Sequence, residues 1–300
     1  MAELYRVYDV ESEVQGLPLV VLLSGFTDSG STISQLSEHL FAHLDNELLI
    51  KFHNDDLLDY RSRRPVLYFE KDHIDSYEPP TLAIYLVHDE ADQPFLLLDG
   101  YEPDFRWDAF AEAVLEICES LAVSSMTWVH SIPFPIPHTR PTGITVSGNR
   151  KELVERYSEW KPQTQVPGNI VHLLEYRLGQ AGYPTVGFVL LVPHYLADNE
   201  VPSAALSGLE LIASATSLVF PSDEIRERSE KFVAKVNSQL EDNPELAKLV
   251  ATLEQSYSSG SGPSRAPIGK PVVEPPSADE IAEELEKYLA TMRKNDPDRE

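Results

Sequence analysis

The sequence predicts an α/β fold in which helices cover both faces of one sheet. Short apolar runs alternate with amphipathic helical patterns through most of the 300 residues. Strands that are apolar on both faces need a helical layer on either side. After Pro221 the strand signal ends and charged helical sequence follows. We therefore expect an α/β core over residues 1–221 and a helical extension over residues 222–256.

The predicted strands are short apolar runs that lie between the helical patterns. The run PLVVLL at 18–23 is the clearest of them. The full set is 18–23, 47–53, 66–69, 81–88, 94–98, 126–132 and 185–192. Such a series, interrupted by helices, is typical of a layered α/β domain.

The predicted helices carry apolar residues three and four positions apart, which is the spacing of one buried helix face. Within residues 108–122 this stripe includes Cys118, the single cysteine, so we interpret Cys118 as a core residue. Asp28, Ser29 or Ser31 can cap the N-terminus of the helix over 31–44, and Gly182 can end the helix over 168–181 in a left-handed conformation. The core helices are expected at 31–44, 108–122, 168–181 and 203–217.

The C-terminal part has a different character. Residues 222–256 predict two charged helices, broken near Asn243-Pro244. Residues 257–277 are rich in Ser, Gly and Pro, which is typical of a flexible linker. Residues 278–294 contain a short amphipathic helix, expected at 278–293, whose apolar face must dock on the core, pack in an oligomer or bind a partner.

The charge and the hydropathy exclude several classes of protein. The formal net charge is −25, which disfavours binding to nucleic acid or to an anionic membrane, because both depend on Lys and Arg. No apolar run approaches the roughly 20 residues of a spanning helix. The N-terminus lacks the basic and apolar regions of a signal peptide, and one cysteine allows no internal disulfide. We expect a cytoplasmic protein.

The stretch GFTDSGST at 25–32 follows the first strong strand and resembles a phosphate-binding loop. In such a loop a lysine contacts the terminal phosphates, but Ser31 occupies that position here, so the sequence disfavours an ATPase. A glycine-bearing turn before a helix N-terminus still favours an anion. The alternative is that Gly25 and Gly30 serve only the geometry of a tight turn.

Polar residues follow four of the predicted strands. Asp28 comes after 18–23, a group from Asp99 to Asp104 comes after 94–98, and His138 to Arg140 come after 126–132. His194 and Tyr195 come after 185–192. If these strands are parallel, all four loops leave the carboxyl edge of the sheet, where α/β folds bind ligands.

These residues define a candidate small-molecule site. His138 and His194 are candidate acid–base groups, because histidine titrates near neutral pH, although the sequence does not assign a catalytic residue. Arg140 and one or more of Arg61, Arg63 and Arg64 would clamp an anion. Asp28, Glu102 and Asp104 would orient hydroxyl groups or those cations. The candidate ligand-binding residues are Asp28, Gly30, Arg61, Arg64, Glu102, Asp104, His138, Thr139, Arg140, His194 and Tyr195.

Motifs for metals and cofactors are not found. The histidines His39 and His43 stand four residues apart, but no HExxH glutamate lies between them, so we interpret them as a solvated helix edge. Neither G-x-G-x-x-G nor G-x-S-x-G occurs, so we expect no metal and no cofactor.

Several longer segments carry a resemblance to a known family. The segments include LLSGFTDSGSTISQLSEHL at 22–40, LLDGYEPDFRWDAFAEAV at 97–114 and IPFPIPHTRPTGITVSGN at 132–149. Further ones are DDLLDYRSRRP at 55–65, VPGNIVHLLEYRLGQAGYPTVGF at 166–188 and VPHYLADNEVPSAAL at 192–206. Together they cover most of residues 18–220 in order. The chain resembles the PAC2 family, named after proteasome assembly chaperone 2, and specifically its bacterial branch.

The resemblance implies a three-layer α/β/α sandwich, similar to the purine nucleoside phosphorylase/hydrolase-like fold, with a C-terminal helical extension. It also implies a chaperone function, because such relatives bind proteasome α-type subunits. Some of those relatives end in a hydrophobic-Tyr-any tripeptide, whereas this chain ends in Asp298-Arg299-Glu300. The resemblance therefore does not carry the proteasome link to this terminus.

Three functional hypotheses follow from the sequence. The first is a non-enzymatic protein-binding or assembly-chaperone-like module that self-associates as a homo-oligomer. The alternative is a phosphorylase-like or hydrolase-like enzyme, or a binder of a small anionic or nucleoside-like ligand, at the carboxyl edge. In the third, the candidate residues only hold loops together by charge-assisted hydrogen bonds.

Overall fold

The computed structural model describes residues 4–10, 14–158, 163 and 165–258. Contacts divide the chain into two compact units. The first unit comprises residues 1–161 and 167–265, and the second comprises residues 162–166 and 266–300. Every helix and strand described here lies in the first unit, and the second contributes only residues 163, 165 and 166 to the description.

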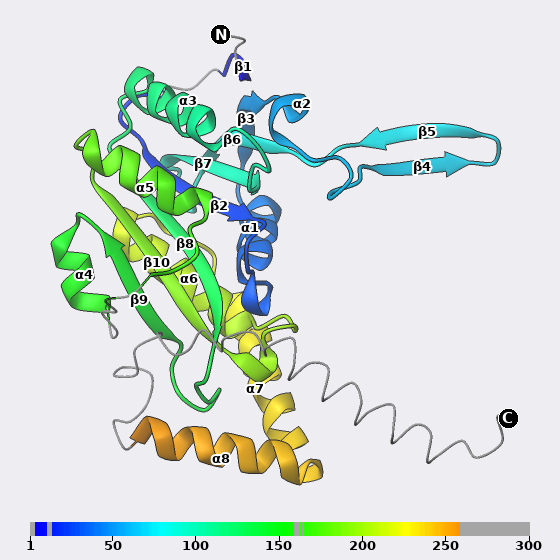
Figure 1. Ribbon diagram of the computed structural model, residues 1–300, viewed down its shortest axis with the longest axis vertical. Coiled ribbons are helices and arrows are strands. Elements are labelled where there is room, and N and C mark those ends of the chain that lie inside the picture. The colour runs from blue at the N-terminus through cyan, green and yellow to red at the C-terminus, as the bar shows by residue number, and fades with distance from the viewer. Residues whose placement is uncertain (1–3, 11–13, 159–162, 164, 259–300) are drawn as a thin grey trace, which may run out of the picture. The chain divides into compact units, whose positions relative to one another are not determined.

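The core of the first unit is a mixed sheet of eight strands (Figure 1). Its order is β1-β3-β6-β7-β2-β8-β10-β9. The strands are β1 (Tyr5–Val7), β2 (Pro18–Ser24), β3 (Asn46–Phe52), β6 (Leu82–His88), β7 (Pro94–Tyr101), β8 (Ser125–Phe134), β9 (Gly143–Gly148) and β10 (Thr185–Pro193).

Four neighbouring strands of the sheet, β7, β2, β8 and β10, run parallel. Strand β2 pairs in parallel with β7 and β8, and β8 pairs in parallel with β10. The condition on which the sequence-based site depends, that these four strands are parallel, is therefore met. Their carboxyl ends meet at one edge of the sheet, which brings the four polar loops to the same side of the fold.

Helices cover both faces of the sheet. Helices α3 (Trp107–Ser120) and α5 (Ile170–Gln180) bury Phe110 and Leu174 in one apolar cluster on the sheet. Helices α1 (Thr32–His43) and α6 (Pro202–Thr216) bury Leu36 and Leu209 in a second cluster. The predicted α/β class, with a sheet covered on both faces, is confirmed. No described helix is long and apolar enough to cross a membrane.

Local predictions about the helices also hold in this structure. Cys118 is fully buried in α3, and burial raises the pKa of its thiol to about 12, which fits a core residue. Gly182, just after α5, has a φ of +90°, as the left-handed helix end requires.

The helical extension consists of α7 (Asp223–Asp242) and α8 (Pro244–Ser258). Asn243 separates them, at the predicted break. Helix α7 packs on α6, and α8 packs on α7. Residues 259–300, which include the predicted 278–294 region and most of the predicted 257–277 linker, lie outside the described residues.

Several short elements were not predicted from the sequence. Strands β1 and β9 pair antiparallel at the two edges of the sheet, and their residues are partly exposed and mixed in polarity, so no apolar run marks them. Two short helices, α2 (Asn54–Leu57) and α4 (Lys151–Tyr157), were missed as well. The predicted strand at 66–69 exists as β4 (Val66–Glu70), but it pairs only with β5 (His73–Glu78), in a separate hairpin.

Candidate functional site

The predicted site residues divide into two groups at the carboxyl edge. One group surrounds the ends of β2 and β7, and the other surrounds the ends of β8 and β10. Among the residues that the structure describes, no hydrogen bond or ion pair joins the two groups. The first group contains Asp28, Gly30, Arg61, Arg64, Glu102 and Asp104, and the second contains His138, Thr139, Arg140, His194 and Tyr195.

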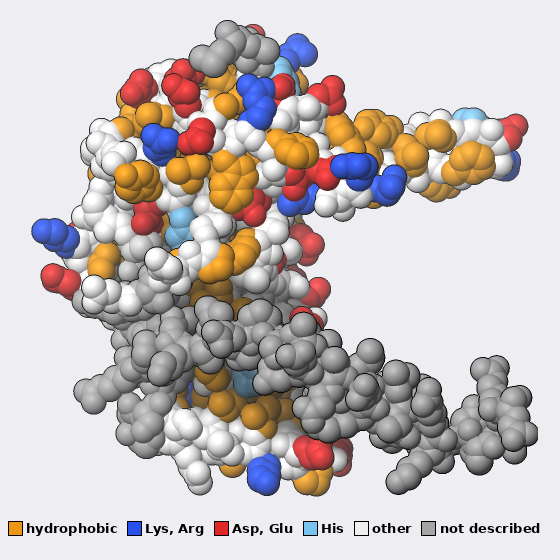
Figure 2. Space-filling model, viewed as in Figure 1, with side chains coloured by type: hydrophobic (Ala, Val, Ile, Leu, Met, Phe, Trp, Pro, Cys, Tyr) orange, Lys and Arg blue, Asp and Glu red, His pale blue; other side chains and the backbone are white. Residues whose placement is uncertain are grey.

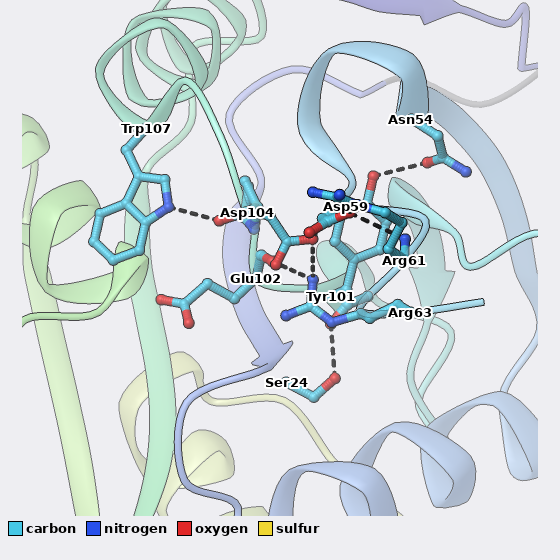
Figure 3. A network of polar contacts seen from close by, with 11 residues as sticks. Ser24, Asn54, Asp59, Arg61, Arg63, Tyr101, Glu102, Asp104 and Trp107 are labelled. Carbon is cyan, nitrogen blue, oxygen red and sulfur yellow. Dashed lines mark hydrogen bonds and ion pairs between the residues drawn. The ribbon is translucent and has the colours of Figure 1, made fainter.

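Arg63 is the centre of the first group (Figure 3). Its Nη1 donates to the backbone oxygen of Glu102 and to Oδ2 of Asp104, both at 2.9 Å. Its guanidinium also lies over the ring of Tyr101, 5.4 Å from the centroid. Asp104 accepts a second hydrogen bond, from the backbone N–H of Asp59 at 2.7 Å. The arrangement ties the loop before β4 to the loop after β7.

The network continues through buried polar contacts. The hydroxyl of Tyr101 donates to Oδ1 of Asn54 at 2.8 Å, and Nδ2 of Asn54 donates to the backbone oxygen of Pro80 at 2.7 Å. Gly25 provides the space for this network, because a Cβ there would lie 2.7 Å from Cβ of Glu102 and 2.8 Å from Nη2 of Arg63. Gly25 has a φ of +152°, so backbone and space both require glycine.

Arg61 and Arg64, the two arginines of this group that were selected from the sequence, do not share the contacts of Arg63 with Glu102 and Asp104. Arg61 has an 88% exposed side chain and contacts only Asp59, at 3.6 Å. Arg64 is exposed and forms no ion pair with a described residue. Arg63, which the candidate list omits, is the arginine that the fold holds in place. No periodicity in RSRR distinguishes it, because the loop follows no regular pattern.

Asp28 and Gly30 have structural partners at the start of α1. The Asp28 carboxylate accepts from the backbone N–H groups of Ile33 at 2.7 Å and Ser34 at 3.1 Å, which is the expected capping role. Gly30 has a φ of +72° and exchanges backbone hydrogen bonds with Ala197 and Val201. A Cβ on Gly30 would lie 2.9 Å from Cβ of Val201, so the close approach requires glycine.

Glu102 connects the end of β7 to α5, which lies on the other face of the sheet from α1. Its Oε1 accepts from the backbone N–H of Ile170, the first residue of α5, at 2.7 Å. A carboxylate is favourable at this position because it faces the positive end of the helix dipole. Burial nevertheless raises the pKa of Glu102, and the hydrogen bond from Ile170 opposes that shift.

In the second group, His138 bridges the core and α7. Its backbone N–H and its Nδ1 both contact the hydroxyl of Tyr195, at 2.8 and 2.6 Å. Its Nε2 lies 3.1 Å from Oδ1 of Asn237 on α7. Burial raises the pKa of Tyr195. His138 therefore has partners on both ring nitrogens, as a side chain that fastens a helix would.

The neighbours of His138 contact α8. Thr139 donates a hydrogen bond to Glu254, and the Arg140 guanidinium lies 5.7 Å from the ring centroid of Tyr257. His194 is exposed and stacks edge-on against Tyr195. The loop that the sequence suggested as an anion clamp thus holds the helical extension by polar contacts.

A buried histidine lies on β8, between β2 and β10 in the sheet order. His130 on β8 is 4% exposed, and its Nε2 lies 3.3 Å from Oγ1 of Thr27. Burial and the nearby His172 lower the pKa of His130 to about 4, so it is neutral at physiological pH. The exposed ring of Phe26 stacks on it at 5.5 Å. The sequence could have indicated His130, because this histidine lies inside the predicted strand MTWVHSI.

A cavity of about 410 Å³ opens beside the Arg63 network, between the ends of β2 and β7 and the first turns of α1. Its polar lining comes from Ser24, Ser34, Ser37, Glu38, Arg63 and Asp99. Burial raises the pKa of Asp99 to about 6, and a hydrogen bond with Ser37 opposes the shift. Asp99 was not selected from the sequence, although an aspartate inside the run PFLLLDGY was a usable signal.

The described residues hold no group of three or more His, Cys, Asp or Glu side chains placed to bind a metal ion. The interpretation of His39 as a solvated residue was wrong. His39 is 5% exposed, and its Nε2 lies 2.6 Å from the backbone oxygen of Pro221, because the start of the helical extension covers this side of α1. His43 pairs with Glu224 at 3.0 Å.

Comparison with known proteins gives a family and several solved structures. The family model described as "PAC2 family" matches residues 22–240. Among curated proteins, none matches the sequence significantly. The structure of Mycobacterium tuberculosis protein Rv2714, of unknown function, is 38% identical, with a TM-score of 0.80, over 87% of this chain and 90% of that one.

Two further structures share the fold. A Corynebacterium glutamicum protein of unknown function is 34% identical, with a TM-score of 0.81, over 88% of this chain and 100% of that one. The Mycobacterium tuberculosis proteasome-assembly chaperone homologue Rv2125 is 21% identical, with a TM-score of 0.72, over 78% of this chain and 100% of that one.

Proposed function

Since the chain belongs to the PAC2 family, we propose that it is a non-enzymatic protein-binding module of the assembly-chaperone kind. The name given to its structural neighbour Rv2125, a proteasome-assembly chaperone homologue, supports this class. The observation that carries the proposal is the hairpin of β4 and β5, whose apolar side chains lie open to solvent. The cytoplasmic location of the protein stays a prediction from the sequence.

The hairpin presents more apolar surface than a solvated loop needs. Exposed hydrophobic side chains gather along it (Figure 2). Six of them are more than half exposed, namely Val66, Leu67, Tyr68, Phe69, Ile74 and Tyr77. A two-stranded hairpin is marginally stable by itself in water, so an ordered hairpin of this composition indicates a partner surface.

The strand register sorts these side chains into one apolar face. Leu67 lies opposite Tyr77, and Phe69 lies opposite Ile74, so the four side chains point to the same side. A bulge between these two pairs gives β5 one extra residue, Asp75, and without it Ile74 and Tyr77 would lie on opposite faces. The other face mixes Val66 and Tyr68 of β4 with the polar side chains of β5.

The occupant that fits this face best is a second copy of the chain. Arginines lie at the base of the hairpin, where Arg61 and Arg64 are exposed, and acids lie toward its tip, where Asp72 and Asp75 are exposed. Two copies related by a two-fold axis would place each base against the other tip, because such an interface is self-complementary. The Leu67–Tyr77 pair would then face the Phe69–Ile74 pair.

Sedimentation velocity of the full chain tests this function. We expect wild type to sediment as an oligomer whose fraction grows with protein concentration. The variant Leu67→Lys with Phe69→Lys places two charges on the apolar face and should sediment as a monomer, because a buried unpaired charge opposes association.

The matched control is Val66→Lys with Tyr68→Lys, which puts the same charges on the other face of the same strand. It should keep the oligomer. A wild-type chain that stays monomeric at every concentration, or two double variants with equal effects, would contradict the role of the apolar face. Mixing with proteasome α-type subunits in the same experiment tests whether the hairpin also binds a different protein.

A second candidate function is a small-molecule site at the carboxyl edge of the sheet. The cavity of about 410 Å³ beside Ser24 and Asp99 favours it, because its size matches the roughly 300–1,000 Å³ of ligand pockets. Its lining contains two carboxylates, whereas its one arginine, Arg63, is paired with Asp104. The lining therefore supports a ligand other than the small anion expected from the sequence.

A further inference from the structure

The cavity at the ends of β2 and β7 contains a carboxylate, Asp99, that no Lys or Arg among the described residues neutralises. Asp99 is the sixth residue of β7 and lies opposite Leu22 of β2 in the ladder. Within the described part of the chain no Lys or Arg forms an ion pair with it, and Ser37 is its one side-chain hydrogen-bond partner. Asp99 is partly buried, and withdrawing an unpaired carboxylate from water is unfavourable, so the position is unusual for a purely structural residue.

The rest of the lining supplies hydrogen-bond acceptors and a further negative charge. The hydroxyls of Ser24, Ser34 and Ser37 line the cavity, and the exposed Glu38 lies at its rim on α1. Arg63 does not supply the missing charge, because it is already paired: its Nη1 bonds to Asp104 and to the backbone oxygen of Glu102 (Figure 3). The unmet requirement in the cavity is a cation that donates hydrogen bonds.

We propose that this cavity binds a small ligand through a primary ammonium group, with Asp99 as its counter-ion and the serine hydroxyls as further acceptors. An ammonium has three N–H donors and no acceptor, which matches a wall of one carboxylate and several hydroxyls. The proposal rests on the second candidate function, a small-molecule site at the carboxyl edge, and it names the chemical class of the ligand.

Three probes of equal length test the class: 1,4-diaminobutane, 1,4-butanediol and succinate. Each is added to the full-length protein, and the shift of the unfolding temperature is measured against the same protein without probe. We expect the diamine to stabilise wild type and the Asp92→Asn control, and to lose its effect on Asp99→Asn. Asp92 is an exposed residue in the turn at the opposite end of β7, where Asn also tolerates its φ of +59°.

The pH dependence gives a second readout that a general salt effect would not produce. The ligand binds ionised Asp99, whose pKa is about 6, so the affinity should be roughly tenfold higher near pH 7 than near pH 5. The charged and titratable groups around Asp99 are Tyr85, Tyr101, Glu38 and Arg63. The tenfold change should be absent in Asp99→Asn.

The outcomes separate the ligand class from the site itself. Stabilisation by succinate or the diol, but not by the diamine, would overturn the cationic class and keep the carboxyl-edge site. Equal stabilisation of wild type and Asp99→Asn by the diamine would overturn the role of Asp99. No stabilisation by any of the three probes would overturn both the ligand class and the second candidate function, and it would leave the hairpin proposal unaffected.

Discussion

At the scale of single residues, the most informative group is the carboxyl of Asp99. Its pKa is about 6 in the folded protein, against an ordinary value of 3.8, because burial disfavours the charged form. The native state therefore binds a proton more tightly than the unfolded chain does. The destabilisation is negligible near pH 3, grows as the pH rises through the interval between the two pKa values, and is nearly complete at pH 7.

This linkage predicts that Asp99→Asn stabilises the protein without ligand near neutral pH. The expected gain is about 3 kcal/mol, since the pKa rises from 3.8 to about 6 and each unit of pKa shift is worth ~1.4 kcal/mol. Near pH 3 the gain should vanish, because wild-type Asp99 is then mostly protonated in both states. Chemical denaturation at a series of pH values measures it, with Asp92→Asn as the control. A gain that is equal at both ends of the pH range would contradict the assignment.

The role of a single residue could be predicted from the sequence where a local pattern indicated it. The capping role of Asp28 was expected from its place before a helix, and Asp28 does cap α1. The choice between Arg61, Arg63 and Arg64 could not be made, because it depends on contacts with Asp104 and Glu102, some forty residues away. Tertiary contacts of this kind leave no spacing signal in the chain.

At the scale of elements, the pairing of β8 with β10 shows how closely the sheet is built. Gly187 of β10 lies opposite Trp128 of β8, and the indole occupies the space beside it. A Cβ on Gly187 would lie 2.1 Å from Cε2 of Trp128. Trp128 is fully buried and donates from Nε1 to Glu175 at 2.8 Å, so its ring is held in place.

Gly187→Ala should therefore destabilise the protein strongly. We expect a loss of about 3 kcal/mol, the upper part of the usual range for overpacking. Gly168→Ala is the control, because nothing lies within 4 Å of a Cβ there, and its effect should stay within about 0.5 kcal/mol. Equilibrium unfolding in denaturant measures both. Equal stabilities for the two variants would show that the indole moves aside.

The sequence predicted the central elements better than the peripheral ones. Buried parallel strands and amphipathic helices are defined by hydrophobicity, and β2, β7, β8 and β10 lie where it predicted them. Strand β5, with the sequence HIDSYE, was missed because its side chains are exposed and mostly polar. Its pairing with β4 places Ile74 and Tyr77 on one apolar face, which only the register reveals.

At the scale of the whole molecule, the net charge and the exposed apolar face of the hairpin both favour a protein as the partner. A net charge of −25 disfavours nucleic acid as a partner. The apolar face of the hairpin instead favours protein, and its base and tip carry opposite charges that suit a second copy. The two groups of candidate site residues have different neighbours, because the loop around His138 holds α7 and α8, whereas the ends of β2 and β7 border the cavity.

The most direct measurement of the central claim, that the hairpin is a protein-binding surface, is hydrogen exchange of its backbone as a function of protein concentration. The amides of an isolated two-stranded hairpin exchange fast because the hairpin opens readily, whereas burial of its apolar face suppresses that opening. We predict that protection over residues 66–78 rises with concentration, while β2, an inner strand of the sheet, stays equally protected throughout. Fast exchange over residues 66–78 at every concentration would contradict the account.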